Sequence, residues 1–259
     1  MARVRYARSL RDLEDAKRAR RVADEAAVRL LGCRYETDPE AISAVVPRPL
    51  EAAPESEVEI VVAVSQAGGE TRAGALIGAR VEYDGVAAVM PFAMPCDDEA
   101  AVLEGRERFG EPRRRAKVEL EASEDHVSAG VTRRGVSFLR LGGRRGEAVD
   151  FPEWKGTSFS FKAFPSADPT KDFDHDPQLV RSDWRFVAEA AWRVEGGLEL
   201  WDSPFDPIAD LPVRRLVGVT YAEGTVRREA RVLRPIPGDW LLPFLHQRDD
   251  APATRGVDV

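Results

Sequence analysis

The chain has 259 residues, of which 43% are hydrophobic, so it can bury a substantial core in one large domain or two small ones. Its formal net charge is −7, and its arginines are interleaved with Asp and Glu, which disfavours a nucleic-acid-binding function. The charged N-terminus argues against a signal peptide, and the lack of a long apolar run argues against a membrane span. The two cysteines are widely separated, which argues against a metal site or a disulfide framework. We therefore expect a soluble cytoplasmic protein.

Two helices are expected near the N-terminus. Residues 7–27 contain no helix breaker and few apolar positions, which predicts an exposed or oligomer-contacting helix. Residues 1–28 are therefore assigned to an N-terminal helical segment. Asp38 and Pro39 then form a helix start, with Asp as the N-cap and Pro in the first turn, and predict a helix over Glu40–Val46.

Most of the remaining chain has patterns typical of β-strands. Tight turns are predicted at Asp84-Gly85, at Arg134-Gly135 and, inside Trp184–Trp201, at Gly196-Gly197. The other expected strands are Glu57–Val64, Arg80–Tyr83, Val86–Met90, Val118–Glu121, Val127–Thr132, Val136–Leu141, Phe159–Ala163 and Val213–Tyr221. Many short strands and few helices predict a mainly β (α+β) fold, in which an antiparallel sheet must curl or close on itself.

A short helix and two irregular segments complete this organisation. Asp97 or Asp98 is expected to cap a helix that runs to about Phe109. Pro165–Pro177 is a polar loop rich in Asp and Pro. No repeat or linker divides residues 29–248, which we expect to form one domain, and residues 249–259 are expected to be a disordered tail.

Short motifs along residues 29–245 are individually weak but keep one order. They are YETDPE from Tyr35, VPRPLE from Val46, DDEAA from Asp97, GRERFGEPRRRAK from Gly105, FKAFP from Phe161, and Leu198-Glu199-Leu200 followed by PIADLPV from Pro207. The ordered set resembles the acetoacetate decarboxylase family, whose active-site segment is usually written G-R-E-x-x-G-x-P-K-K-x-A. The resemblance implies a curved antiparallel β-barrel or cone around an apolar cavity, with a few flanking helices and assembly into homo-oligomers.

The sequence departs from this family at the residues that carry its chemistry. In the family, the first lysine of the pair forms an iminium with a β-keto acid, which then loses carbon dioxide. The two lysine positions fall on Arg113 and Arg114 here. A guanidinium stays protonated at any working pH and cannot attack a carbonyl, so the resemblance does not predict Schiff-base decarboxylation for this chain.

The resemblance also assigns residues to a substrate site. Arg113 is expected in the cavity, where its planar fork suits a carboxylate or enolate oxygen, with Arg114 as a substrate-binding neighbour. The alternative is that these arginines are solvated or ion-paired at the surface. Phe161 is expected to line the cavity, and Arg29 falls near the family's arginine, although out of register without a gap.

Two further positions correspond to the family's cavity acids. The first acid falls on Glu59, and the second falls on Arg72 if a short insertion is allowed. Together with Arg113, Glu59 and Arg72 are therefore the candidate catalytic residues, and Arg113 or Arg72 would pair with Glu59 if it is buried. A half-exposed strand with alternating Glu57 and Glu59 is the alternative.

We therefore expect an enzyme that carries out a cyclisation, lyase or isomerisation step on a keto-acid or polyketide-type metabolite by electrostatic stabilisation. Its substrate would have an apolar body and a carboxylate or enolate group. No metal and no cofactor are expected, because the spacing in Asp172–Asp176 is too unspecific for a metal site.

Two alternative functions stay open. The first is a β-keto-acid decarboxylase with a relocated lysine, for which Lys162 is the best amine although alternation places it opposite Phe159 and Phe161. The second is a non-catalytic protein that binds a small molecule in the same cavity.

Overall fold

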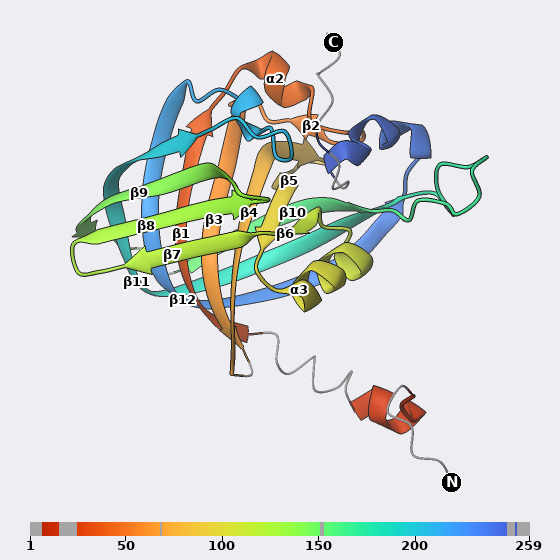
Figure 1. Cartoon of the computed structure of the whole chain (residues 1–259), viewed down its shortest axis with the longest axis horizontal. Helices are drawn as coiled ribbons and strands as arrows, with labels where there is room; N and C mark the ends of the chain where they lie inside the picture. The colour runs from red at the N-terminus through yellow and green to blue at the C-terminus, as the bar shows by residue number, and fades with distance from the viewer. Residues whose placement is uncertain (1–6, 16–24, 68, 151–152, 248–251, 253–259) are drawn as a thin grey trace.

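A computed structural model describes residues 7–15, 25–67, 69–150, 153–247 and 252 (Figure 1). Its strands are β1 (Glu25–Glu36), β2 (Glu51–Ala52), β3 (Glu57–Ala67), β4 (Glu70–Tyr83), β5 (Val86–Cys96), β6 (Arg113–Arg115), β7 (Lys117–Ala122), β8 (His126–Arg133), β9 (Val136–Ala148), β10 (Glu153–Lys162), β11 (Gln178–Leu200) and β12 (Arg215–Pro235). Its helical elements are α2 (Pro39–Ser43), α3 (Glu99–Glu104), a π-helical turn η1 (Gly105–Phe109) and the 3-10 turns η2 (Ile208–Asp210), η3 (Gly238–Trp240) and η4 (Leu242–Gln247). The prediction of a mainly β fold is confirmed.

The described strands form one mainly antiparallel sheet, part of which closes on itself. β10 pairs with β5 on one side and with β11 on the other, so β10, β5, β4, β3, β1, β12 and β11 form a ring. The β5–β10 pairing is parallel and rests on the single pair Val89 and Ser158, whereas the other ring pairings are antiparallel ladders. The ring therefore depends on a contact between segments far apart in the sequence.

A second part of the sheet covers one face of the ring. The first half of β11 pairs with β10 and its second half with β9, which continues into β8 and β7. Figure 1 shows β7, β8 and β9 crossing in front of β1, β3 and β4. The main hydrophobic core fills the space between these layers and includes fully buried Leu31, Ile60, Ile77, Val131 and Leu141.

The opposite face of the ring carries the candidate site. Residues directly paired across neighbouring strands point to the same face of a sheet. Leu30 of β1 is paired with Ala63 of β3 and with Ala222 of β12. Arg228 lies on the same face of β12 as Ala222 and is paired with Trp184 of β11. We call this the site face. It holds a small apolar cluster of Val28, Phe186, Ala191 and Ala222.

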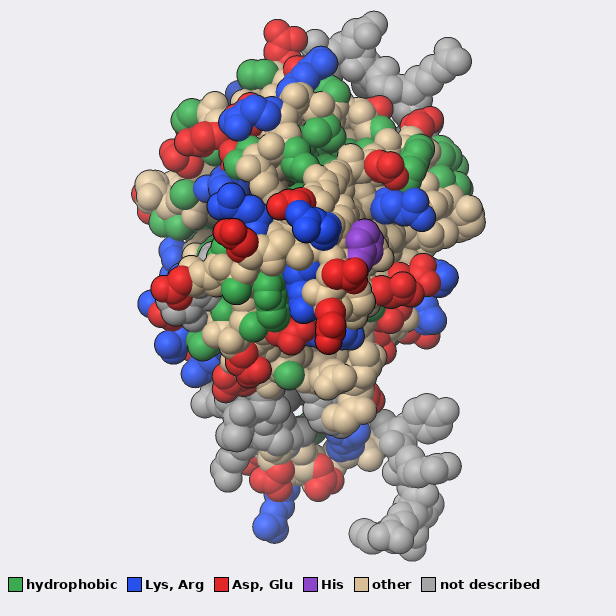
Figure 2. All heavy atoms as spheres, turned by 90° about the vertical axis from the view of Figure 1, so that its left-hand side faces the viewer, with side chains coloured by type: hydrophobic (Ala, Val, Ile, Leu, Met, Phe, Trp, Pro, Cys, Tyr) green, Lys and Arg blue, Asp and Glu red, His purple; other side chains and the backbone are tan. Residues whose placement is uncertain are grey.

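The surface carries mixed charge. Figure 2 shows one side of the molecule, on which acidic and basic side chains are interspersed with scattered hydrophobic ones. Within the described residues, no helix has the length and apolar character needed to cross a membrane.

Two predicted elements differ from the structure, and one strand was not predicted. Residues 25–27, expected to end a helix, begin β1; the described helical stretch covers only residues 10–15, and residues 16–24 lie outside the described part. β1 was missed because its place is set by ladders to both β3 and β12. Gly196-Gly197 is not a turn: both lie inside β11, opposite Gly143 and Gly142, where a Cβ on Gly196 would overlap the backbone of Gly142.

Other elements are found with different bounds. α2 ends at Ser43, before the predicted end of this helix. β4, β9, β10 and β12 are all longer than expected, and β12 extends to Pro235. Asp84-Gly85 and Arg134-Gly135 are confirmed as tight turns, since all four residues have positive φ.

Candidate functional site

The motif from Gly105 to Lys117 forms a helix end, a turn and a short strand. Asp98 caps α3 by accepting a hydrogen bond from the backbone N–H of Ala101 at 2.6 Å, as its position in the sequence predicts. Gly110, at φ +71°, then reverses the chain and packs against the backbone of Lys162. β6 follows and pairs in parallel with the end of β5. Successive residues of β6 consequently point to opposite faces.

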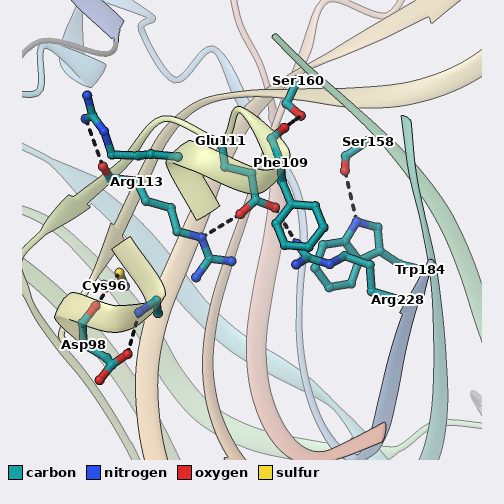
Figure 3. A network of polar contacts seen from close by, with 11 residues as sticks. Cys96, Asp98, Phe109, Glu111, Arg113, Ser158, Ser160, Trp184 and Arg228 are labelled. Carbon is teal, nitrogen blue, oxygen red and sulfur yellow. Dashed lines mark hydrogen bonds and ion pairs between the residues drawn. The ribbon is translucent and has the colours of Figure 1, made fainter. Parts of the chain in front are cut away.

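Arg113 contributes a guanidinium to the site face. Its Nε donates to Glu111 Oε2 at 2.7 Å, and its aliphatic part lies against Gly105, where any side chain would overlap it. Burial disfavours its charged form, but Glu111 and Cys96 outweigh this effect, so the pKa of Arg113 lies above its usual value. Figure 3 shows its two terminal nitrogens pointing away from Glu111. Arg113 therefore lies on the site face in an ion pair with Glu111, and its predicted role in a substrate cavity stays a prediction.

A second guanidinium lies on the other side of Glu111. Arg228 Nη1 donates to Glu111 Oε1 at 2.6 Å, and Glu111 itself is only 4% exposed (Figure 3). Burial lowers the pKa of Arg228, and Glu111 opposes that change. Sequence reasoning missed both residues, because Glu111 occupies a variable position of the motif and Arg228 lies beyond the predicted strand.

Aromatic rings hold Arg228 in place. Its guanidinium carbon lies 3.7 Å from the ring centroid of Phe109 and 4.9 Å from that of Trp184. Trp184 Nε1 donates to Ser158 Oγ at 3.0 Å, and Ser160 Oγ donates to the carbonyl of Phe109 at 2.7 Å. The ring of Trp184 and the backbone of Phe109 are therefore both held by β10, and the cation between the two rings has a defined position.

The thiol of Cys96 also adjoins Arg113. Its Sγ lies 3.6 Å from the carbonyl oxygen of Asp98. Burial raises the pKa of Cys96, whereas the charge of Arg113 and its hydrogen bond oppose that rise. The thiol is therefore protonated near neutral pH and serves as a neutral polar neighbour of the guanidinium.

Arg114 points to the main core instead of the site face. Its Nη1 donates to the carbonyl of Phe205 at 2.9 Å and lies 3.4 Å from Asp206 Oδ1. Arg133 Nε donates to Asp206 Oδ2 at 2.6 Å, and all three charged side chains are almost fully buried. Arg114 thus anchors β6 to β8 and to the loop before η2. Asp206 was not recognised from the sequence.

Glu59 lies on the site face within its own charged cluster. Its Oε2 is 3.6 Å from Arg80 Nη1, while neighbouring Glu57 pairs with both Arg80 and Arg34. Burial raises the pKa of Glu59, and Arg80 and Arg34 oppose that rise. The side chain is 14% exposed, so Glu59 is a largely buried acid, and its catalytic role stays a prediction.

Register separates Glu59 from the cluster around Arg113. Gly78 of β4 lies opposite Glu59, and Gly74 lies opposite Cys96, which contacts Arg113. Gly74 and Gly78 are four residues apart in β4, and four residues of strand span about 13 Å, so the positions of Glu59 and Cys96 are separated by about this distance. The structure does not bring Glu59 and Arg113 into contact, and each has a different ionic partner.

Arg72 lines a surface cavity of about 410 Å³ together with Ala100, Glu104, Glu107 and Arg108. It forms ion pairs with Glu70 at 2.6 Å and with Asp98 at 3.5 Å. The charges of Glu104 and Arg108 act on Arg228, so this cavity adjoins the Arg228 side of the site. Arg72 is thus placed at the edge of the site.

The remaining predicted residues lie elsewhere. Arg29 contacts Tyr221 on the face of β1 that carries the main core, and Phe161 is 5% exposed in that core. Lys162 shares the face of Ser158 and Ser160 at the end of β10, with its Nζ 5.6 Å from the ring centroid of Phe164. Among the described residues, no group of three or more His, Cys, Asp or Glu is arranged to hold a metal ion.

Comparison with known proteins identifies the family. The family model described as acetoacetate decarboxylase (ADC) matches residues 14–235. The chain belongs to the acetoacetate decarboxylase family. An acetoacetate decarboxylase of Burkholderia vietnamiensis is 32% identical over 192 residues, which cover 71% of this chain and 76% of the relative. One from Bordetella avium is 32% identical over 196 residues, covering 72% and 78%.

Solved structures of other proteins share the fold. Acetoacetate decarboxylase of Legionella pneumophila superposes with a TM-score of 0.72 at 21% identity, covering 82% of this chain and 88% of that one. The enduracididine biosynthesis enzyme MppR, in complex with pyruvate, gives a TM-score of 0.69 at 15% identity, covering 82% and 90%. Proteins that share this fold therefore include an enzyme of a biosynthetic pathway.

Proposed function

We propose that this protein binds a keto acid through its carboxylate and transforms it without a lysine iminium. One observation carries the proposal: the guanidinium of Arg113 occupies the motif's first lysine position, and its two terminal nitrogens point away from Glu111 (Figure 3). The planar guanidinium fork matches a carboxylate in a bidentate geometry, and it cannot act as an amine nucleophile.

The charge of the site supports an anionic substrate. Arg113 and Arg228 share one carboxylate, that of Glu111, so the cluster carries one excess positive charge. Phe109 and Trp184 add apolar surface beside it. Fixed cations in a partly buried site suit reactions that pass through an enolate, which include lyase, cyclisation and isomerisation steps on keto acids or polyketide-type metabolites. Because MppR was solved with pyruvate, a 2-oxo acid is the first probe to use.

Binding measurements test the role of Arg113. We expect calorimetric titration with pyruvate to show binding that Arg113→Ala weakens at least tenfold, because the carboxylate loses its bidentate partner. Arg144→Ala is the matched control, since Arg144 is exposed and pairs with Glu195 on distant strands. Equal affinity of Arg113→Ala and the native protein for pyruvate, or no binding by either, would contradict the proposal.

A second candidate, a decarboxylase with a relocated lysine, is favoured by the curated relatives named acetoacetate decarboxylase and by the position of Lys162 on the site face. Borohydride reduction with acetoacetate, followed by peptide mass spectrometry, separates the two. We expect no lysine adduct, with the Burkholderia vietnamiensis enzyme as positive control. An adduct on Lys162 would establish the second candidate and exclude the first.

A further inference from the structure

We infer that Arg228 is a second catalytic residue, which stabilises the enolate oxygen while Arg113 holds the carboxylate. The inference rests on the proposed function and divides its chemistry between two guanidinium groups. Nothing in the motif around Arg113 points to Arg228, because it lies in β12, more than a hundred residues further along the chain.

The geometry places the two guanidinium groups within reach of one small molecule. Arg113 Nε and Arg228 Nη1 bind different oxygens of Glu111, at 2.7 and 2.6 Å. Each guanidinium therefore has N–H groups that Glu111 does not occupy. A 2-oxo acid carries its carboxylate and its carbonyl oxygen on adjacent carbons, so a single substrate can contact both groups.

Arg228 is fixed before any substrate arrives. Phe109 and Trp184 lie against its guanidinium, and Ser160 and Ser158 hold these residues to β10. A cation that is already oriented stabilises developing charge without reorganisation, which is the main source of electrostatic catalysis. The two aromatic faces also shield part of Arg228, whose side chain is 20% exposed, and this shielding strengthens its interaction with an anion.

The balance of charge favours the enolate over the ketone. With two arginines and one glutamate, the empty cluster has a charge of about +1, and a bound carboxylate neutralises it. Forming the enolate adds one negative charge. Burial already disfavours the charged form of Arg228. A new negative charge on the enolate oxygen stabilises this cation, whereas the uncharged carbonyl oxygen of the ketone stabilises it much less. Arg228 therefore binds the enolate-like transition state more strongly than the substrate.

Deuterium exchange at C3 of pyruvate isolates this step. A proton leaves C3 to a solvent base, its C–H electron pair forms the C2–C3 double bond, and the carbonyl π electrons move to the oxygen beside Arg228. Return of a deuteron from D₂O to C3 regenerates the ketone, so no oxidant or other reactant is consumed. Loss of the methyl proton signal in NMR spectra gives the rate.

We expect Arg228→Gln to slow exchange at saturating pyruvate at least tenfold while the dissociation constant for pyruvate changes less than threefold. Arg228→Lys, which keeps a positive charge, should recover part of the rate. Arg113→Ala should instead raise the dissociation constant. Arg227→Ala is the matched control, because Arg227 is the exposed neighbour of Arg228 in β12 and pairs with Glu229. Thermal unfolding of each variant confirms that it is folded.

The outcomes distinguish this inference from the function it rests on. If Arg228→Gln weakens pyruvate binding as strongly as it slows exchange, or leaves both unchanged, Arg228 is not the enolate-stabilising residue, although the carboxylate role of Arg113 stands. Binding of pyruvate by the native protein without any catalysed exchange leads to the same conclusion. Absence of pyruvate binding overturns both statements.

Discussion

At the residue scale, Glu111 determines how the two guanidinium groups act. Two arginines placed side by side in a partly buried site would repel each other, and a shared carboxylate offsets this repulsion. Glu111 binds the Nε of Arg113, so the two terminal nitrogens point away from Glu111, with Cys96 as a further hydrogen-bond neighbour of this guanidinium. Glu111 is thus a positioning residue that also keeps Arg228 charged despite burial.

Glu59 makes the stability of the protein depend on pH in a specific direction. Burial raises its pKa above the ordinary 4.5, so the folded protein binds this proton more tightly than the unfolded chain does. The contribution of Glu59 to stability therefore falls as pH rises from about 4.5 through the raised value. We expect Glu59→Gln to remove this decline, which urea unfolding between pH 4.5 and pH 8 measures.

Glu119→Gln serves as the control for this experiment, since Glu119 is exposed on β7 and pairs only with Lys117. Its pH profile should match that of the native protein. The expected signal is the difference between the native and Glu59→Gln profiles, because other carboxylates contribute equally to both. Parallel profiles would show that the proton affinity of Glu59 is the same in the folded and unfolded states.

Sequence reasoning located only part of the site. Arg113 was found because it lies inside a contiguous motif, and Glu59 because it falls on a cavity-acid position of the family that the sequence resembles. Arg228 and Trp184 meet the motif only through the pairing of β11 with β12, and that register depends on contacts across the whole chain. No local pattern could have joined them to Glu111.

At the scale of elements, the turn between η1 and β6 sets the geometry of the site. Gly110 has a left-handed backbone and packs directly on Lys162 and Phe161 of β10. A side chain there meets both the backbone penalty and a steric overlap. The turn orients the side chains of Glu111 and Arg113, so any displacement of the turn changes the geometry of the site as well as the free energy of unfolding.

We expect Gly110→Ala to lower the free energy of unfolding by about 2 kcal/mol or more and to weaken pyruvate binding. Gly135→Ala is the matched control: its φ is +81°, yet nothing lies within 4 Å of its added Cβ, so it should lose only about 1 kcal/mol and bind normally. Denaturant unfolding and calorimetry measure both effects. Equal stability losses would mean that packing at Gly110 contributes nothing.

Turns were easier to predict than strands. Asp84-Gly85 and Arg134-Gly135 are hairpins because the chemistry of two adjacent residues suffices to favour the turn. Gly196-Gly197 gave the same local signal, but the facing glycines of β9 allow a close pairing of strands there. β1 shows the same limit, because its strand state is set by two partners remote in sequence.

At the scale of the whole molecule, the buried Arg114–Asp206–Arg133 cluster joins three regions. It ties β6 on the ring to β8 in the covering layer and to the loop that precedes η2. Removing the anion from such a cluster leaves two buried cations facing each other, which is far more costly than losing a surface ion pair.

Asp206→Asn should therefore lower the free energy of unfolding by about 3 to 5 kcal/mol. Glu195→Gln, which removes an exposed partner of Arg144, should cost at most about 1 kcal/mol. Urea denaturation at one pH provides the comparison. A small effect of Asp206→Asn would indicate that the two arginines find other acceptors and that the cluster does not hold the layers together.

The overall class and the need for the sheet to curl or close were predictable, whereas the strands that meet at the closure were not. Alternating residues over many short segments sufficed to predict a mainly β protein. The ring closes through Val89 and Ser158, and its covering layer forms because β11 changes partner halfway along. Both features arise from long-range pairing, and single-strand patterns carry no information about which strands become neighbours.

The short strand β6 has a consequence for how this protein can change. Arg114 is committed to the core through Asp206, while Arg113, one residue earlier, faces the site. The contact that anchors the strand and the side chain of the proposed site thus lie on opposite faces of the same three-residue strand. The side chain at position 113 can therefore be exchanged without disturbing the anchor at position 114. Under the proposed function, position 113 is thus a replaceable reaction centre on a fixed scaffold.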